Sequence, residues 1–175
     1  TYVLVQGDKR VFQAQENLRD DFNKTASELR DKKVLTFMKE GIAKVVITKA
    51  GGTITLTRQE APATPTKPGE KASEKMSVWK DGNGQEVATT EVDILVSSLS
   101  SLECEGYIDA LTKTGMKEPE TTITLSDGKE YSLSLYAKEG EKTPMTSSGS
   151  DSVFFLPEYR MEGIIKGVEA LAGKK

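Results

Sequence analysis

The 175-residue chain contains no histidine, and cysteine occurs once, at Cys104. Zinc sites draw on His and Cys side chains, and Ser-His-Asp and Cys-His catalysis both need an imidazole. The lack of histidine therefore excludes these classes of catalysis and most zinc sites. A single cysteine forms no internal disulfide, so the sequence is compatible with a reducing and with an oxidising compartment.

The chain also lacks an excess of positive charge and any long apolar run. Lys and Arg total 24 against 27 Asp and Glu, which gives a net charge of −3. This balance offers no electrostatic reason to expect a polyanion, so we expect no nucleic-acid partner. The longest apolar runs fall far short of the roughly 20 residues that a membrane-crossing helix needs. Any membrane contact is expected through a segment outside these residues.

The sequence signatures of common enzyme classes are missing as well. Neither a G-x-S-x-G pattern nor a phosphate-binding loop occurs in the chain. Clusters of ligand-type residues with metal-site spacing are also absent. The loop after Trp79 resembles a calcium loop, but it has Val92 where such a loop requires a bidentate acid. We therefore expect no enzyme activity, no catalytic residue, no metal and no cofactor.

Turn residues between alternating apolar and polar residues predict a series of β-hairpins. Residues Tyr2 to Val5 and Arg10 to Ala14 flank the first turn. Gly51-Gly52 and Asp127-Gly128 set two further turns, because glycine adopts the positive φ that tight hairpin turns require. A fourth hairpin is expected before residue 158. The sequence thus predicts a mostly antiparallel sheet.

Apolar residues at helical spacing predict three main helices, each with a buried stripe. We expect helices at about Glu16 to Lys32, Thr90 to Leu102 and Glu158 to Leu171. A threonine at position 89 or 90 is expected to cap the second helix. Strand pairs combined with helices place the chain in the α+β class. The predicted inward-facing residues are Leu18, Phe22, Ala26 and Leu29; Val92, Leu95, Val96, Leu99 and Leu102; and Met161, Ile164, Ile165, Val168 and Leu171.

One stretch near the N-terminus is echoed near the C-terminus. GDKRVFQAQE, from Gly7, and GSDSVFFLPE, from Gly149, share Gly, Val-Phe and Glu at the same spacing. This match predicts an internal repeat of a hairpin followed by a helix. We accordingly divide the chain into a first unit, residues 1–75, which ends in a Pro-rich loop at 60–75, and a second unit, residues 76–175, which ends in the repeat.

Candidate contact residues are few. Trp79, the single tryptophan, is a candidate anchor for a partner, although an aromatic residue in a strand is more often part of the core. Ser147, Ser148 and Ser150 lie in a Ser- and Gly-rich turn whose backbone N–H groups and hydroxyls are able to line a ligand site. The alternative is an ordinary exposed hairpin turn.

Four segments carry a family resemblance: residues 2–12, 29–32, Trp79 with 88–102, and 153–165. In their order along the chain they resemble the bacterial family called domain of unknown function 4340. The resemblance implies a membrane-anchored protein with repeated units outside the cytoplasm, in some cases beside ABC transport components of the gliding-motility type. It supplies no active-site residues.

Together, the residues and the resemblance lead to one functional expectation. The chain is expected to be a non-catalytic binding or scaffold module on the extracytoplasmic face of the cell envelope, tethered by a segment outside these residues. Its partners are then other envelope proteins, and an ABC-transport-type assembly is the expected setting. A small-solute or glycan-binding domain is the alternative, and a hydrolase based on Ser or carboxylate groups ranks behind both. A cytoplasmic location is the alternative compartment.

Overall fold

The computed structural model describes residues 2–14, 22–60 and 77–172, and the chain divides into two compact units. The N-terminal unit is Thr1–Asp31, and the main unit is Lys32–Lys175. All buried residues of the described part belong to the main unit. The predicted boundary at residues 75 and 76 lies inside its sheet, because strands on both sides of the boundary pair with each other.

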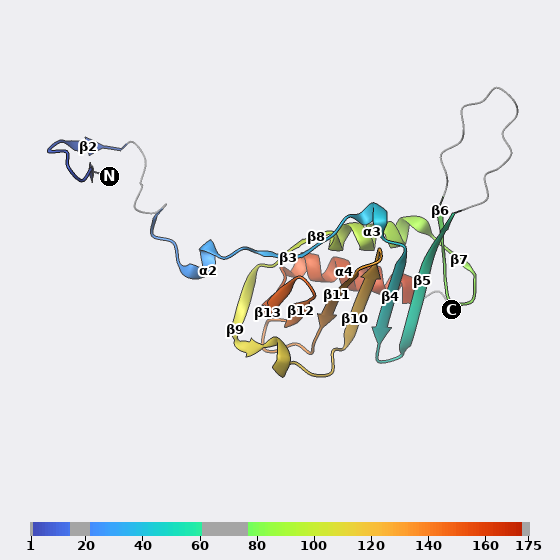
Figure 1. The fold of residues 1–175 in the computed structure, drawn as a ribbon. Helices are drawn as coiled ribbons and strands as arrows, with labels where there is room; N and C mark the ends of the chain where they lie inside the picture. The colour runs from blue at the N-terminus through green and yellow to red at the C-terminus, as the bar shows by residue number, and fades with distance from the viewer. Residues whose placement is uncertain (1, 15–21, 61–76, 173–175) are drawn as a thin grey trace, which may run out of the picture. The chain divides into compact units, whose positions relative to one another are not determined.

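Nine antiparallel strands form the sheet of the main unit (Figure 1). Their order across the sheet is β7-β6-β5-β4-β10-β11-β12-β13-β9. The hairpins predicted at Gly51-Gly52 and at Asp127-Gly128 are present as β4–β5 and β10–β11. The bounds of the nine strands are β4 Lys44–Lys49, β5 Gly52–Glu60, β6 Ser77–Lys80, β7 Glu86–Val87, β9 Gly106–Thr112, β10 Thr121–Ser126, β11 Glu130–Leu135, β12 Met145–Ser147 and β13 Ser150–Phe155.

The two faces of this sheet differ in chemistry. Ile47, Ile123 and Leu133 lie opposite one another on three neighbouring strands, and all three are buried. On the other face the row beside them is hydroxylated, with Thr48 opposite Thr122 and Thr122 opposite Ser134. This alternation is typical of an antiparallel sheet that covers a core with one face only.

Two helices, α3 (Thr89–Leu99) and α4 (Glu158–Ala172), cover the apolar face and pack against each other (Figure 1). Their buried side chains lie at helical spacing, which confirms most of the second and third predicted stripes. α3 is capped differently from the prediction, because Ala88 is the N-cap and provides no side-chain hydrogen bond. The buried side chains are Val92, Leu95, Val96 and Leu99 in α3, and Ile164, Val168 and Leu171 in α4.

A second, two-stranded sheet pairs β3 (Lys33–Thr36) with β8 (Ser101–Glu103). Leu102, predicted as the last residue of a helix, lies in β8 and is buried there. The turn between β12 and β13 approaches β3 closely. A Cβ at Gly149 would lie 2.7 Å from the carbonyl oxygen of Val34, so the turn requires glycine at this position. Short helical turns, η1 (Lys39–Gly41) and η2 (Lys113–Gly115), complete the main unit.

The N-terminal unit contains the first predicted hairpin, β1 (Tyr2–Leu4) with β2 (Val11–Gln13). The continuous helix predicted for residues 16–32 is wrong: the chain is not helical at residues 23–25, and α2 spans only Ala26–Leu29. Thr25 and Glu28 form a capping box that starts α2, and Arg30 is already extended. Residues 15–21 lie outside the described residues, so the predicted hairpin-to-helix repeat is not confirmed.

Candidate functional site

Large apolar side chains are concentrated on the surface of the N-terminal unit. Among the described residues, ten large hydrophobic side chains are exposed, and seven of them belong to this unit. Scattered exposed hydrophobics are normal on a protein, but a concentration of them marks an interaction site. The seven are Tyr2, Leu4, Val5, Val11, Phe12, Phe22 and Leu29.

The hairpin that carries most of these side chains has no core of its own. β1 and β2 pair with each other, and the residues of β2 are all exposed. α2 contributes no buried residue either. An isolated two-stranded hairpin is at best marginally stable in water, and three strands or a packed helix are needed for independent stability. The hairpin therefore has the properties of an element that is completed by another surface.

The turn of the hairpin is held by polar contacts rather than by packing. Asp8 accepts hydrogen bonds from the backbone N–H of Arg10 at 3.0 Å and from its guanidinium at 2.7 Å. These bonds, the side-chain bond first, hold the pKa of the Asp8 carboxyl below its usual value. The Arg10 guanidinium lies 5.3 Å from the centre of the Phe12 ring. Gly7 has a φ of 89°, which suits glycine. The turn is thus held by contacts within the hairpin itself.

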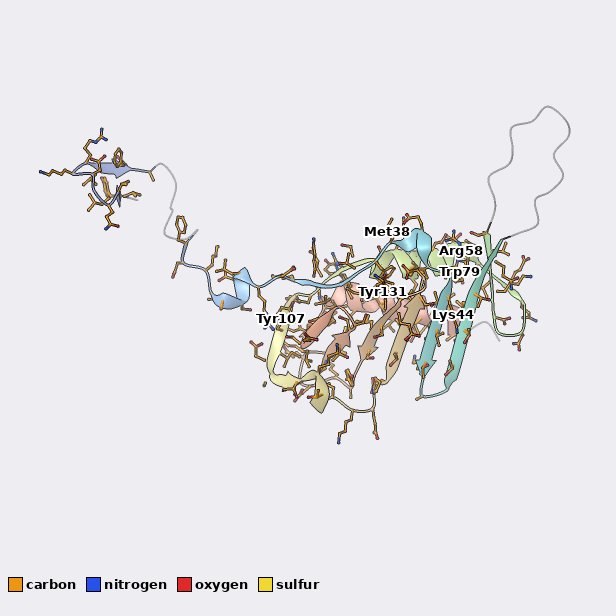
Figure 2. All side chains as sticks on the ribbon, viewed as in Figure 1. Met38, Lys44, Arg58, Trp79, Tyr107 and Tyr131 are labelled. Atoms are coloured by element: carbon orange, nitrogen blue, oxygen red, sulfur yellow. The ribbon has the colours of Figure 1, made fainter. Side chains whose placement is uncertain are left out.

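Trp79, the candidate anchor, lies in the core of the main unit, where only 1% of it is exposed. It stands opposite Arg58 in the register of β5 and β6, and Figure 2 shows the two labelled side chains near one end of the sheet. Its indole N–H has no hydrogen-bond partner among the described residues. Burial leaves this side chain no surface to offer a partner, so the core interpretation holds.

The three candidate serines surround the turn between β12 and β13, and the fold itself uses them. The Ser147 hydroxyl is buried and donates to the carbonyl of Val34. Ser148 Oγ accepts from the backbone N–H of Ser132 at 3.0 Å. Lys113 Nζ donates to the carbonyls of Ser147 and Ser150, at 2.7 and 2.8 Å. These hydrogen bonds fasten the turn to its neighbours. They also occupy the Lys113 ammonium and the Ser147 hydroxyl, which are donors that an anion site at this turn would need.

Two adjoining hollows lie beside α4. The larger has a volume of about 500 Å³ and includes Lys142, whose Nζ lies 4.0 Å from the centre of the Phe155 ring. The smaller, about 190 Å³, runs along the apolar side of the helix past Ile165. Both hollows share Lys138, Thr143 and Met161. The larger hollow is lined by both acidic Glu and basic Lys side chains, so its charge selects neither anionic nor cationic ligands.

Two aspartates, Asp81 and Asp127, use their carboxylates to hold neighbouring groups of the fold in place. Asp81 Oδ1 accepts from the backbone N–H groups of Asn83 and Gln85, at 2.9 and 2.8 Å, and so closes the turn after β6. Asp127 accepts from the Tyr131 hydroxyl at 3.3 Å. Burial, followed by the charge of Asp127, raises the pKa of Tyr131. Within the described ranges, no group of three or more acidic or Cys side chains is placed to hold a metal ion.

The fold defines an α+β protein in which an open antiparallel sheet carries two helices on one face. A family model described as Domain of unknown function (DUF4340) matches residues 1–119, about two thirds of the chain. The chain belongs to this family. The matched residues cross from the N-terminal unit into the main unit and end before β10. Comparison with the curated proteins and with the solved structures found no match.

Proposed function

We propose that the chain is a non-catalytic protein-binding module whose docking surface is the N-terminal unit. The observation that carries this proposal is the exposure of large apolar side chains on a hairpin without a core. Tyr2 is 75% exposed and Leu4 is 68% exposed, whereas most large apolar side chains of the main unit are buried. Covering such side chains is worth about 1.5–3 kcal/mol each, which provides the free energy for association.

The proposal extends to the setting in which the module works. The module acts on the extracytoplasmic face of the cell envelope, as an accessory to an envelope or ABC-transport-type assembly, with other envelope proteins as partners. The family resemblance supports this setting, while composition and charge do not select a compartment. Within the described ranges, no helix combines the length and the apolar character that crossing a bilayer requires. A tether would therefore lie elsewhere in the protein.

A small-solute or glycan site is the second candidate, and the larger hollow beside α4 is its location. Its volume of about 500 Å³ lies within the range of ligand pockets. Such pockets are predominantly apolar with a few converging polar groups. This hollow instead has charged residues of both signs on its walls, among them Lys138, Lys142, Glu105, Glu141 and Glu158. The protein-binding proposal is therefore better supported.

Photo-crosslinking from position 12 tests the proposal in the full-length protein in its native cells. A benzophenone amino acid in place of Phe12 is expected to crosslink to a polypeptide other than residues 32–175, because Phe12 would face the partner. The same amino acid in place of Ile94, an exposed residue on α3 that is 62% accessible, is the matched control and should give no product.

Two results would contradict the proposal. One is the absence of any crosslink from position 12, and the other is a crosslink that maps to residues 32–175 of the same chain. The crosslinked protein can be identified by mass spectrometry, so the experiment also tests the proposed setting. An envelope protein would support it, whereas a cytosolic protein would contradict it.

A further inference from the structure

In sequence, residues 1–30 align with residues 143–172, the segment that holds the last hairpin and helix of the main unit. Each residue lies 142 positions before its counterpart, as Gly7 does before Gly149. The second segment, residues 143–172, contains β12, β13 and α4. The burial of residues 143–172 is known, and it shows which positions of residues 1–30 would be buried if they occupied the same place in such a fold.

The buried positions of the second segment have nonpolar or aromatic counterparts throughout the first. Ten residues of the second segment are buried, and none of their ten counterparts is charged or carries an amide or aliphatic hydroxyl side chain. In the same order, the buried residues are Pro144, Met145, Thr146, Ser147, Val153, Phe154, Leu156, Ile164, Val168 and Leu171, and the counterparts are Tyr2, Val3, Leu4, Val5, Val11, Phe12, Ala14, Phe22, Ala26 and Leu29.

The exposed positions show the opposite pattern. Ten residues of the second segment are exposed, and their counterparts in the first are all polar or glycine. Apolar and polar positions are separated in this way when one face of an element packs against another surface. The exposed residues are Ser148, Gly149, Asp151, Glu158, Tyr159, Glu162, Gly163, Lys166, Glu169 and Ala170, and the counterparts are Gln6, Gly7, Lys9, Glu16, Asn17, Asp20, Asp21, Lys24, Ser27 and Glu28.

One backbone pair occupies matching positions in the two hairpins. Val3 lies opposite Phe12 in the first hairpin, and their counterparts Met145 and Phe154 lie opposite each other in the second. At the turns, Asp8 N donates to Val5 O at 3.0 Å, while Ser147 lies opposite Ser150. The two hairpins thus share one backbone pair and a turn of the same length, whereas the second has a register shift between Met145 and Ser147 that the first lacks.

The surroundings of β12 and β13 show what the first hairpin lacks. β12 pairs with β11, β13 pairs with β9, and the turn lies against β3. The close approach to β3 requires glycine at position 149, and the first hairpin has Gly7 at the equivalent position. Nothing lies within 4 Å of a Cβ built on Gly7. Gly7 also suits its own positive φ of 89°, which Gly149 does not share, so the match is one of position and not of backbone conformation.

We infer that the N-terminal unit supplies the terminal hairpin, and a helix that would form only on docking, of a separate domain that has the fold of residues 32–175 and lacks its own copy of them. β1 would pair with that domain's equivalent of β11, and β2 with its equivalent of β9. Phe22, Ala26 and Leu29 would cover its sheet as Ile164, Val168 and Leu171 do in this chain. The inference rests on the proposed function, since it names the partner of the same surface.

A segment exchange within the full chain tests the equivalence. Residues 143–172 are replaced by a second copy of residues 1–30, and a sister chimera carries Val5→Ser in that copy to restore the hydroxyl of Ser147. Unfolding is followed by the fluorescence of Trp79, the single tryptophan, which is buried in the main unit. At least one chimera should unfold cooperatively with a midpoint within about 10 °C of the parent chain.

The matched control chimera carries Phe12→Asp in the copied segment and should show no cooperative transition, because this position is buried in the exchanged setting. Loss of the transition in both test chimeras would overturn the inference, as would a control that unfolds like them. The crosslink from position 12 separates the two proposals. A partner of a different fold would leave the proposed function standing and would overturn this inference.

Discussion

Leu99→Ala is expected to lower the free energy of unfolding of the main unit by about 2–5 kcal/mol. Leu99 is fully buried near the end of α3, and its truncation removes apolar contacts and leaves a cavity. Urea unfolding followed by the fluorescence of Trp79 measures the change.

Ile94→Ala is the matched control on the same helix, because Ile94 is 62% exposed. Its expected effect lies within about 0.5 kcal/mol, as for most surface substitutions away from special contacts. Equal losses for the two variants would show that α3 does not bury the stripe containing Leu99.

Phe154→Ala should destabilise the main unit by about 3–5 kcal/mol, whereas Phe12→Ala should change its stability by less than about 0.5 kcal/mol. Phe12 pairs with Val3 and Phe154 pairs with Met145, so the two residues occupy matching positions in their hairpins. Phe154 is fully buried, while Phe12 is 41% exposed in the N-terminal unit. The same urea experiment serves, because Trp79 reports on the main unit.

A loss of more than about 2 kcal/mol for Phe12→Ala would contradict this account, since it would mean that Phe12 is part of the core that surrounds Trp79. A small loss for Phe154→Ala would instead contradict the placement of β13 inside the sheet. The pair therefore tests both hairpins with one readout.

Local sequence signals were sufficient to predict most hairpins and two of the three main helices. Gly51-Gly52 and Asp127-Gly128 fix their turns through backbone geometry that few other residues adopt, so neighbouring strands are predictable. The stripes of α3 and α4 are predictable because a helix buries every third or fourth residue. The order of the nine strands was not predicted, because pairs such as β4 with β10 join residues far apart in the chain.

Hydrophobic periodicity gave wrong predictions at two places, because it does not show which element packs against an apolar stripe. Leu102 continues the stripe of α3 in sequence but is buried in β8, because a strand can bury a leucine as well as a helix can. The stripe of Phe22, Ala26 and Leu29 predicted a buried helix, and all three residues are exposed. Most helical stability in proteins comes from tertiary packing of an apolar face, and within its own unit this stripe has nothing to pack against.

The candidate docking surface was visible in the sequence only as apolar residues, which were assigned to a core. The match between Gly7 and Gly149 predicted a repeated unit, but it did not show that Phe154 is buried while Phe12 is exposed. Trp79 lies in the core, as the sequence favoured for an aromatic residue in a strand. Burial depends on the whole fold, and sequence spacing alone does not determine it.

Amide hydrogen exchange of the two equivalent hairpins in the isolated chain tests the central claim most directly. If the N-terminal unit awaits a partner, the paired amides of β1 and β2 should exchange orders of magnitude faster than those of β12 and β13, which should open only with the main unit. Equal, strong protection of both hairpins would contradict the account, because the first hairpin would then already be covered within its own chain.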